Sequence, residues 1–79
     1  MSRDPSVMTD PQQCLGEAIS ALRANEFEDA LNLSYRAIEL GLDTTTVWGV
    51  IALANRNRGD YDNAQTAADR AIKLDPRNA

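Results

Sequence analysis

The chain of 79 residues contains no histidine and a single cysteine, Cys14. Histidine is the commonest general base and the commonest zinc ligand, so its absence argues against an enzyme or a zinc site. One cysteine cannot form an intramolecular disulfide, so no covalent bond stabilises the small core. No phosphate-binding glycine motif and no calcium-loop spacing occurs. We therefore expect no catalytic residue, no metal and no cofactor.

Long apolar runs are also missing. No segment approaches the roughly 20 apolar residues of a membrane span. The first eight residues contain no apolar stretch of the kind found in a signal peptide. We expect residues 1–9 to be a flexible arm, residues 10–79 to be one domain, and the protein to be cytoplasmic and not bound to membrane.

The charge balance excludes another class of partner. Eight basic and twelve acidic residues give a net charge of −4, whereas nucleic-acid binding favours a strongly basic face. Hydrophobic residues make up 43% and charged residues 25%, which is typical of a folded globular domain. The expected partner is therefore a protein or peptide.

Apolar residues recur with helical spacing in four segments, at about 11–24, 27–40, 45–58 and 61–74. Asp10, Thr44 or Thr45, and Asp60 are suited to cap three of these helices. Gly41 and Gly59 stand where a left-handed residue ends a helix. The short connections predict two antiparallel helical hairpins.

The two hairpins repeat at a spacing of 34 residues. A shift of 34 places Phe27 on Tyr61 and Ala30 on Ala64. The same shift aligns Arg36-Ala37-Ile38 with Arg70-Ala71-Ile72, Leu40 with Leu74, and Ala18 with Ala52. Small residues at these places allow close approach of helices, so the coincidence indicates a structural repeat.

The second copy, residues 45–78, resembles the tetratricopeptide repeat over its full length. The resemblance is carried by Trp48, Ile51-Ala52, Gly59-Asp60-Tyr61-Asp62, Ala64, Ala71 and Leu74-Asp75-Pro76. Asn55 and Ala68 depart from it, because aromatic residues are common at both places. The resemblance implies an all-α fold of two hairpins stacked as a short right-handed α-solenoid.

The first copy, residues 11–44, resembles the family less closely. Its second helix fits, but its first helix places Cys14 at the tryptophan position and Glu17 at the leucine position. A shift of that helix by two residues would place Leu15-Gly16 there instead, with a longer turn. The two registers remain open from sequence.

Repeats of this family are scaffolds that bind peptides or proteins, usually in a groove lined by the first helix of each pair. The resemblance therefore implies a non-catalytic interaction module. The positions carried over to this groove are Leu15, Ile19, Leu22, Arg23, Gly49, Leu53, Arg56 and Asn57.

Two features of this groove have alternative interpretations. The leucines and isoleucine either bind an amphipathic partner helix or belong to the core of a rotated first helix. Arg23 and Arg56 either attract an acidic partner or only complement helix dipoles. Cys14, Trp48 and Tyr61 are expected to be core residues rather than a reactive thiol or ligand-stacking rings.

Two repeats are fewer than the roughly three that arrays generally need. We therefore expect an open apolar face around Val50, Leu53, Ala67 and Ala71. A two-fold homodimer that joins these faces is the leading hypothesis. The alternative is a structural or regulatory segment of a longer protein, packed on its own downstream repeats or domain.

Overall fold

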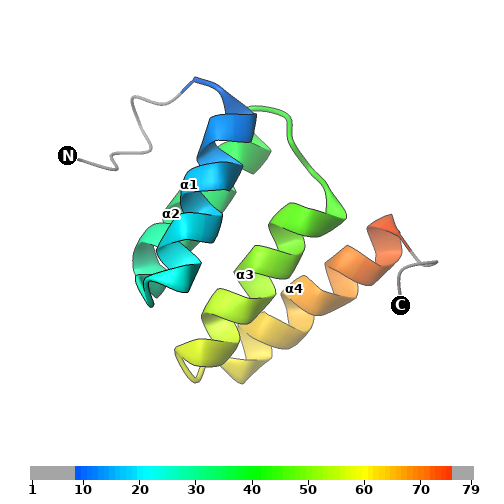
Figure 1. Ribbon diagram of the computed structural model, residues 1–79. Helices are drawn as coiled ribbons and strands as arrows, with labels where there is room; N and C mark the ends of the chain where they lie inside the picture. Colours follow the sequence, from blue (N-terminus) through cyan, green and yellow to red (C-terminus); the bar gives the residue numbers. More distant parts are fainter. Residues whose placement is uncertain (1–8, 76–79) are drawn as a thin grey trace.

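The structure, a computed structural model, describes residues 9–75. They form the helices α1 (Pro11–Arg23), α2 (Phe27–Glu39), α3 (Thr45–Asn57) and α4 (Tyr61–Leu74). α1 and α2 make one antiparallel hairpin, and α3 and α4 make the other (Figure 1). The predicted all-α fold of two helical hairpins is confirmed. All of the predicted N-terminal arm except Thr9 lies outside the described residues.

Side-chain caps begin three of the helices. Asp10, Thr44 and Asp60 directly precede α1, α3 and α4, and each accepts a hydrogen bond from an amide of the first turn, at 3.0, 3.4 and 3.3 Å. α2 has no such side-chain cap, but Glu28 and Asp29 place negative charge in its first turn. These groups offset the exposed amides and positive dipole of the helix start, so local sequence fixes where the helices begin.

The helices α1, α2 and α3 end in the same backbone turn. Asn25, Gly41 and Gly59 follow the helix ends with positive φ angles of 62°, 103° and 82°. In each turn the next amide donates to the carbonyl five residues earlier, at 2.8, 2.9 and 2.9 Å. This pattern satisfies the last carbonyls of a helix and requires the left-handed conformation that glycine and asparagine tolerate best.

The turns settle the register of the first helix. α1 and α3 begin 34 residues apart, and the left-handed residues Asn25 and Gly59 have the same spacing. Cys14 therefore occupies the position of Trp48, and the alternative register shifted by two residues is wrong. The shifted register would need a longer turn, whereas both hairpins close with the same hydrogen bonds.

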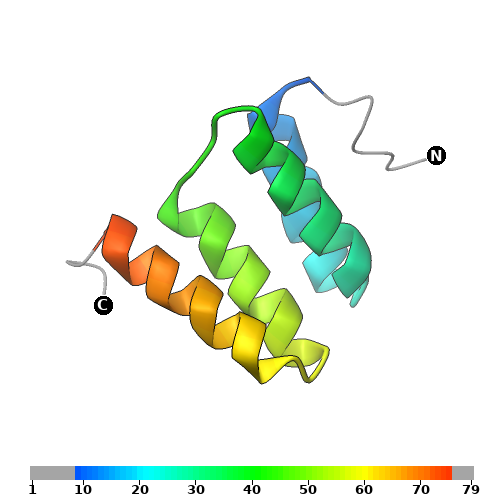
Figure 2. The ribbon, with the colours of Figure 1, turned by 180° about the vertical axis from the view of Figure 1, so that it is seen from behind.

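One buried cluster joins the two hairpins. Each hairpin packs internally, α2 packs against α3, and α1 touches α3 more lightly. Figure 2 shows α2 and α4 on the side opposite to the view of Figure 1. The buried apolar residues are Cys14, Ala18, Ala21, Ala30, Leu31, Leu33, Ala37, Val47, Val50, Ile51, Ala54 and Ala67.

The inner face of α3 packs against the first hairpin. We give this name to Val47, Val50, Ile51 and Ala54, all of which are buried. The residues 34 positions earlier form the outer face of α1, namely Gln13, Gly16, Glu17 and Ser20, which are exposed except for the half-buried Glu17. The difference arises because α1 and α2 cover this side of α3, whereas no described helix precedes α1.

Candidate functional site

A shallow hollow of about 380 Å³ lies between the two helices of the second hairpin. We call it the α3–α4 hollow. Its lining is mainly apolar and small, with Arg56 and Gln65 as the polar members. The residues that line it are Ala52, Leu53, Arg56, Tyr61, Ala64, Gln65 and Ala68. Because three of them are alanines, the helix surfaces leave room for another element.

The hollow lies on the side of α3 opposite to its inner face. Val50 and Leu53 are three residues apart, which corresponds to about 300° around a helix, and Arg56 lies a further 300° on. Leu53 is 46% exposed although Val50 is buried. α3 therefore contacts the first hairpin on one side and borders the hollow on the other.

Two of the eight predicted groove residues, Leu53 and Arg56, line this hollow. Leu15, Ile19 and Leu22 are half-buried and pack against the core, so much of their apolar surface is used within the first hairpin. The interpretation of these three residues as core-packing side chains is the one that their burial favours.

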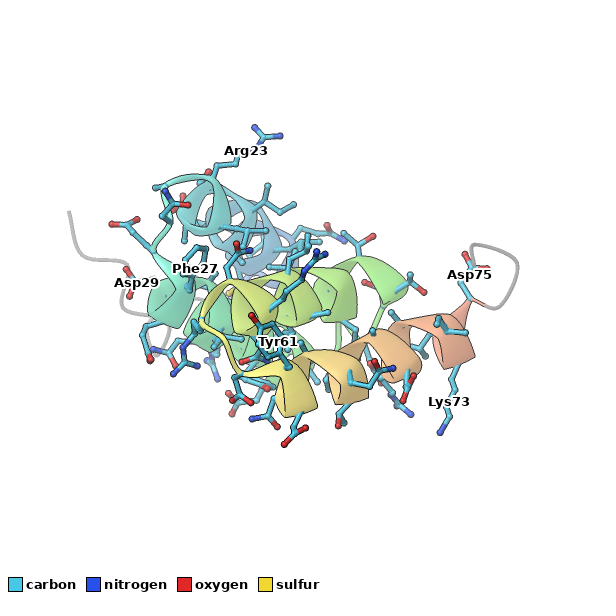
Figure 3. All side chains as sticks on the ribbon, turned by 90° about the horizontal axis from the view of Figure 1, so that it is seen from below. Arg23, Phe27, Asp29, Tyr61, Lys73 and Asp75 are labelled. Carbon is cyan, nitrogen blue, oxygen red and sulfur yellow. The ribbon has the colours of Figure 1, made fainter. Side chains whose placement is uncertain are left out.

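The other predicted groove residues lie apart from the hollow. Arg23 is exposed and points away from the helices (Figure 3). Gly49 is half-buried, and Asn57 donates its side-chain amide to the carbonyl of Leu53 at 2.8 Å. Arg23 and Arg56 each lie in the last turn of a helix, where a cation complements the dipole.

The third arginine near this end of the molecule has an acidic partner. Arg58 Nη2 lies 2.8 Å from Glu28 Oε1, and this ion pair links the end of α3 to the start of α2. The pair borders a second hollow of about 320 Å³, which Phe27 also lines. Arg58 is therefore committed to the contact between the hairpins, and Arg56 is the basic residue of the α3–α4 hollow.

The expected open apolar face differs from the exposed surface. Val50 and Ala67 are buried, with 6% and 1% of their surface exposed, so neither is available to a partner. Val50 lies in the inner face of α3, and Ala67 packs within its hairpin as Leu33 does in the first. Of the four predicted residues, Leu53 is exposed and Ala71 is half-buried.

Five lining residues were missed by sequence reasoning, namely Ala52, Tyr61, Ala64, Gln65 and Ala68. Tyr61 was expected in the core, yet it is 68% exposed. Its counterpart Phe27 is partly buried at the contact with the second hairpin. The signal that would have found these residues is the burial of the positions 34 residues earlier, which depends on a neighbouring hairpin.

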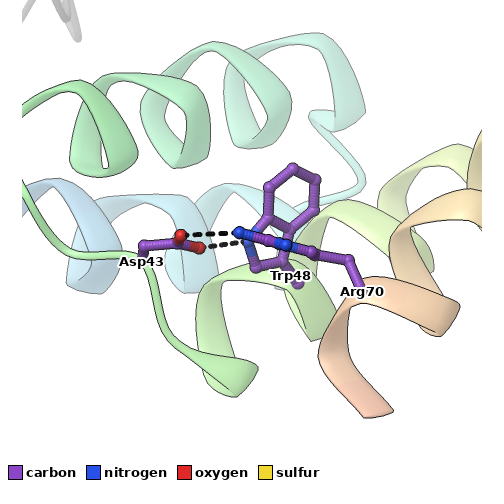
Figure 4. A network of polar contacts seen from close by, with 3 residues as sticks. All are labelled: Asp43, Trp48 and Arg70. Carbon is purple, nitrogen blue, oxygen red and sulfur yellow. Dashed lines mark hydrogen bonds and ion pairs between the residues drawn. The ribbon is translucent and has the colours of Figure 1, made fainter. Parts of the chain in front are cut away.

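Trp48 anchors a polar cluster at the other end of α3. Its indole Nε1 donates to Asp43 Oδ1 at 2.6 Å, and Arg70 Nη2 lies 3.1 Å from Asp43 Oδ2 (Figure 4). The Arg70 guanidinium stacks over the indole, 6.0 Å from its centroid, and Tyr35 meets the ring edge-on at 6.5 Å and 82°. The cluster ties the connection between hairpins to α2, α3 and α4.

The pKa of the Asp43 carboxyl lies below its ordinary value. The main cause is the hydrogen bond from Trp48, and the hydrogen bond and charge of Arg70 add to it, against a smaller opposing effect of desolvation. Trp48 is half-buried and its polar atom is occupied, so its role is to join elements. The expectation of a packing role for Trp48 agrees with these contacts.

Cys14 is fully buried in the first hairpin. Burial raises the pKa of its thiol, although the charge of Arg36 partly opposes this effect. A raised pKa disfavours the reactive thiolate, so the expectation of a buried core residue is confirmed.

No three metal-ligating side chains gather in the part of the chain that the structure describes. None of the four helices described is long and apolar enough to cross a membrane.

Comparison with known proteins identifies the second hairpin. Residues 46–78 match the model of the tetratricopeptide repeat family. No curated protein and no solved structure gave a significant match. The matched segment contains nearly all of α3 and the whole of α4, and the first hairpin repeats its helix spacing and turn. The second hairpin is therefore a tetratricopeptide repeat, and the four helices are consistent with two such repeats.

Proposed function

We propose that the chain is a non-catalytic interaction module that binds a peptide or helix of another protein. Tetratricopeptide repeats are generally protein–protein interaction modules. The observation that carries the proposal for this chain is the exposed apolar side chain of Leu53 beside the alanine-lined α3–α4 hollow. Burial of this surface against apolar side chains of a partner is the source of affinity.

Arg56 gives the same surface a preference for charge. It is exposed at the edge of the hollow, and no ion pair with it occurs among residues 9–75. A carboxylate on the partner gains a charge-assisted contact there. The eight residues of the predicted groove thus contribute unequally, with Leu53 and Arg56 at the centre of the proposed surface and Leu15, Ile19 and Leu22 beside it.

A displayed library of helical peptides tests this function. The full chain is immobilised, and peptides that bind it are selected and sequenced. We expect the selected peptides to lose binding to a Leu53→Asp variant and to retain it with Thr66→Glu. Thr66 is exposed on α4 and does not line the hollow, so it is a matched surface control. Failure to enrich any peptide, or enrichment that Leu53→Asp leaves unchanged, would contradict the proposal.

Self-association is the second candidate function, and a group of exposed apolar side chains favours it. Leu53, Ile72 and Leu74 are 46%, 49% and 39% exposed, on the two helices of one hairpin. A two-fold homodimer would cover such side chains in both copies. Sedimentation equilibrium from about micromolar to near-millimolar concentration tests it. A dimer that Leu53→Asp converts to monomer supports it, and a monomer over the whole range excludes it.

A further inference from the structure

We propose that the α3–α4 hollow receives a helix of a partner protein in the way that the first hairpin receives α3. This inference rests on the proposed function and names the kind of partner. The partner helix carries small and β-branched residues at positions i, i+3, i+4 and i+7, and a carboxylate that faces Arg56.

The seven lining positions have counterparts that are already covered. The residues 34 positions earlier are buried or half-buried, whereas Leu53, Arg56, Tyr61, Gln65 and Ala68 are exposed or half-buried. Ala18, Ala30 and Ser34 are fully buried, and Leu31 is nearly so. The counterparts are Ala18, Ile19, Leu22, Phe27, Ala30, Leu31 and Ser34. The same set of positions is therefore a docking surface in one hairpin and unoccupied in the other.

The element that covers the first set is α3, through its inner face. This face consists of valine, valine, isoleucine and alanine at spacings of three, one and three residues. Such a stripe is narrow enough to approach a surface of alanines and one serine closely. The hollow continues this established interface by one repeat, so a helix with the same stripe fits it.

Two of the counterparts differ in polarity, and they define how the partner differs from α3. Arg56 stands in place of Leu22, and Gln65 stands in place of Leu31. A partner identical to α3 would leave both polar groups without complementary atoms. A helix with a carboxylate toward Arg56 satisfies the arginine and adds selectivity.

A second copy stacked head to tail does not meet these requirements. The helix that it would insert is α1, whose outer face carries two polar residues, a glycine and Glu17. Insertion would bury the carboxylate of Glu17 against the apolar hollow at a large desolvation cost. The hollow and the outer face of α1 are thus not complementary, and the occupant is a different chain.

A peptide with the sequence of residues 44–58 is the first probe, because it is the helix that fits the first hairpin. The isotope-labelled full chain is titrated with this peptide and, as a control, with a peptide carrying Val50→Asp and Ile51→Asp. We expect amide shifts at Leu53, Tyr61, Ala64 and Ala68 with the first peptide and none with the second. Ala68→Glu in the chain should abolish the shifts, and Thr66→Glu should preserve them.

A tethered probe removes the requirement for high affinity. A copy of residues 45–57 is appended so that it begins at position 79 and continues the 34-residue spacing. The tether supplies a high effective concentration. We expect the midpoint of thermal unfolding to rise relative to the same extension with aspartate in place of the copied Val50 and Ile51. Equal midpoints, together with no peptide shifts, would overturn the inference.

The charge requirement has its own test. The peptide selection is repeated on an Arg56→Glu chain, and we expect enriched peptides to exchange aspartate or glutamate for lysine or arginine at one helical position. If the selected peptides depend on Leu53 but neither probe docks, the proposed function stands and this inference fails. If the chain alone dimerises and Ala68→Glu makes it monomeric, the occupant is a second copy and the inference is overturned.

Discussion

At the scale of single residues, Ser34 is a polar group without a use. Its side chain is fully buried in α2, and its hydroxyl has no hydrogen-bond partner among the described residues. The corresponding position in the second repeat is Ala68. A buried and unpaired hydroxyl costs about 1–3 kcal/mol in favour of the unfolded state.

We therefore expect Ser34→Ala to raise the free energy of unfolding by about 1 kcal/mol. Chemical denaturation of both proteins measures the change. Ser20→Ala is the control, since Ser20 is exposed on α1 and reports the gain in helix propensity alone. A Ser34→Ala protein that is less stable than the parent would show that the hydroxyl has an essential partner.

Asp43 predicts how stability depends on pH. Its pKa is lower in the folded chain than in the unfolded chain, so the carboxylate stabilises the fold above the unfolded pKa of about 4. This contribution is lost as the pH falls through the lower, folded pKa. We expect Asp43→Asn to be less stable than the parent at pH 7, with the difference disappearing below pH values of about 4.

Unfolding curves recorded with the fluorescence of Trp48 measure this difference, because the indole donates to Asp43. Asp69→Asn is a suitable control, since Asp69 is an exposed aspartate of α4 without a resolved change in pKa. A constant difference between parent and Asp43→Asn from neutral to acid pH would contradict the assignment.

At the scale of helices and turns, two glycines should respond in opposite ways to one substitution. Gly59 has a φ of 82° in the turn after α3, and a Cβ there strains the backbone whatever the space. Gly16 lies inside α1, where an added Cβ meets no atom within 4 Å. We expect Gly59→Ala to destabilise the chain by about 1 kcal/mol and Gly16→Ala to stabilise it by about 0.5–1 kcal/mol.

Thermal unfolding of the two variants checks the pair of signs. Gly59→Asn serves as an intermediate case, because Asn25 occupies the corresponding turn with a φ of 62°. It should cost less than Gly59→Ala. Loss of stability in Gly16→Ala would mean that α1 does not tolerate a larger residue on its outer face.

The elements that could be predicted from sequence are those fixed by local chemistry. The caps Thr44 and Asp60, the turn at Gly59 and the span of α4 follow from short-range backbone requirements. The 34-residue spacing placed the hairpins in the same way. The exposure of Tyr61 and the burial of Val50 could not be predicted from the repeat pattern, because equivalent positions differ in whether a neighbouring hairpin covers them.

At the scale of the whole molecule, α3 couples the two hairpins. Ile51 lies on its inner face and is 1% exposed, whereas Leu53 on the same helix is 46% exposed. We expect Ile51→Ala to lower the free energy of unfolding by about 2–4 kcal/mol, because it leaves a cavity in a small core. Leu53→Ala should cost less than about 1 kcal/mol.

Hydrogen exchange distinguishes coupling from local damage. In Ile51→Ala, protection should fall in α2 as well as in α3 and α4, since the altered face packs against the first hairpin. A loss of protection confined to the second hairpin would contradict the coupling. Leu53→Ala, which keeps the core intact, should leave protection unchanged in both hairpins.

The contrast between the inner face of α3 and the outer face of α1 also fixes the order of the repeats along the chain. The two hairpins share their backbone turns, but their first helices are not interchangeable. A permuted protein, with residues 45–75 placed before residues 11–44, would bury Gln13, Glu17 and Ser20 between the hairpins and turn Val47, Val50 and Ile51 toward solvent. Although such a protein would have the same composition and the same helices, it would lack the apolar contact that joins them.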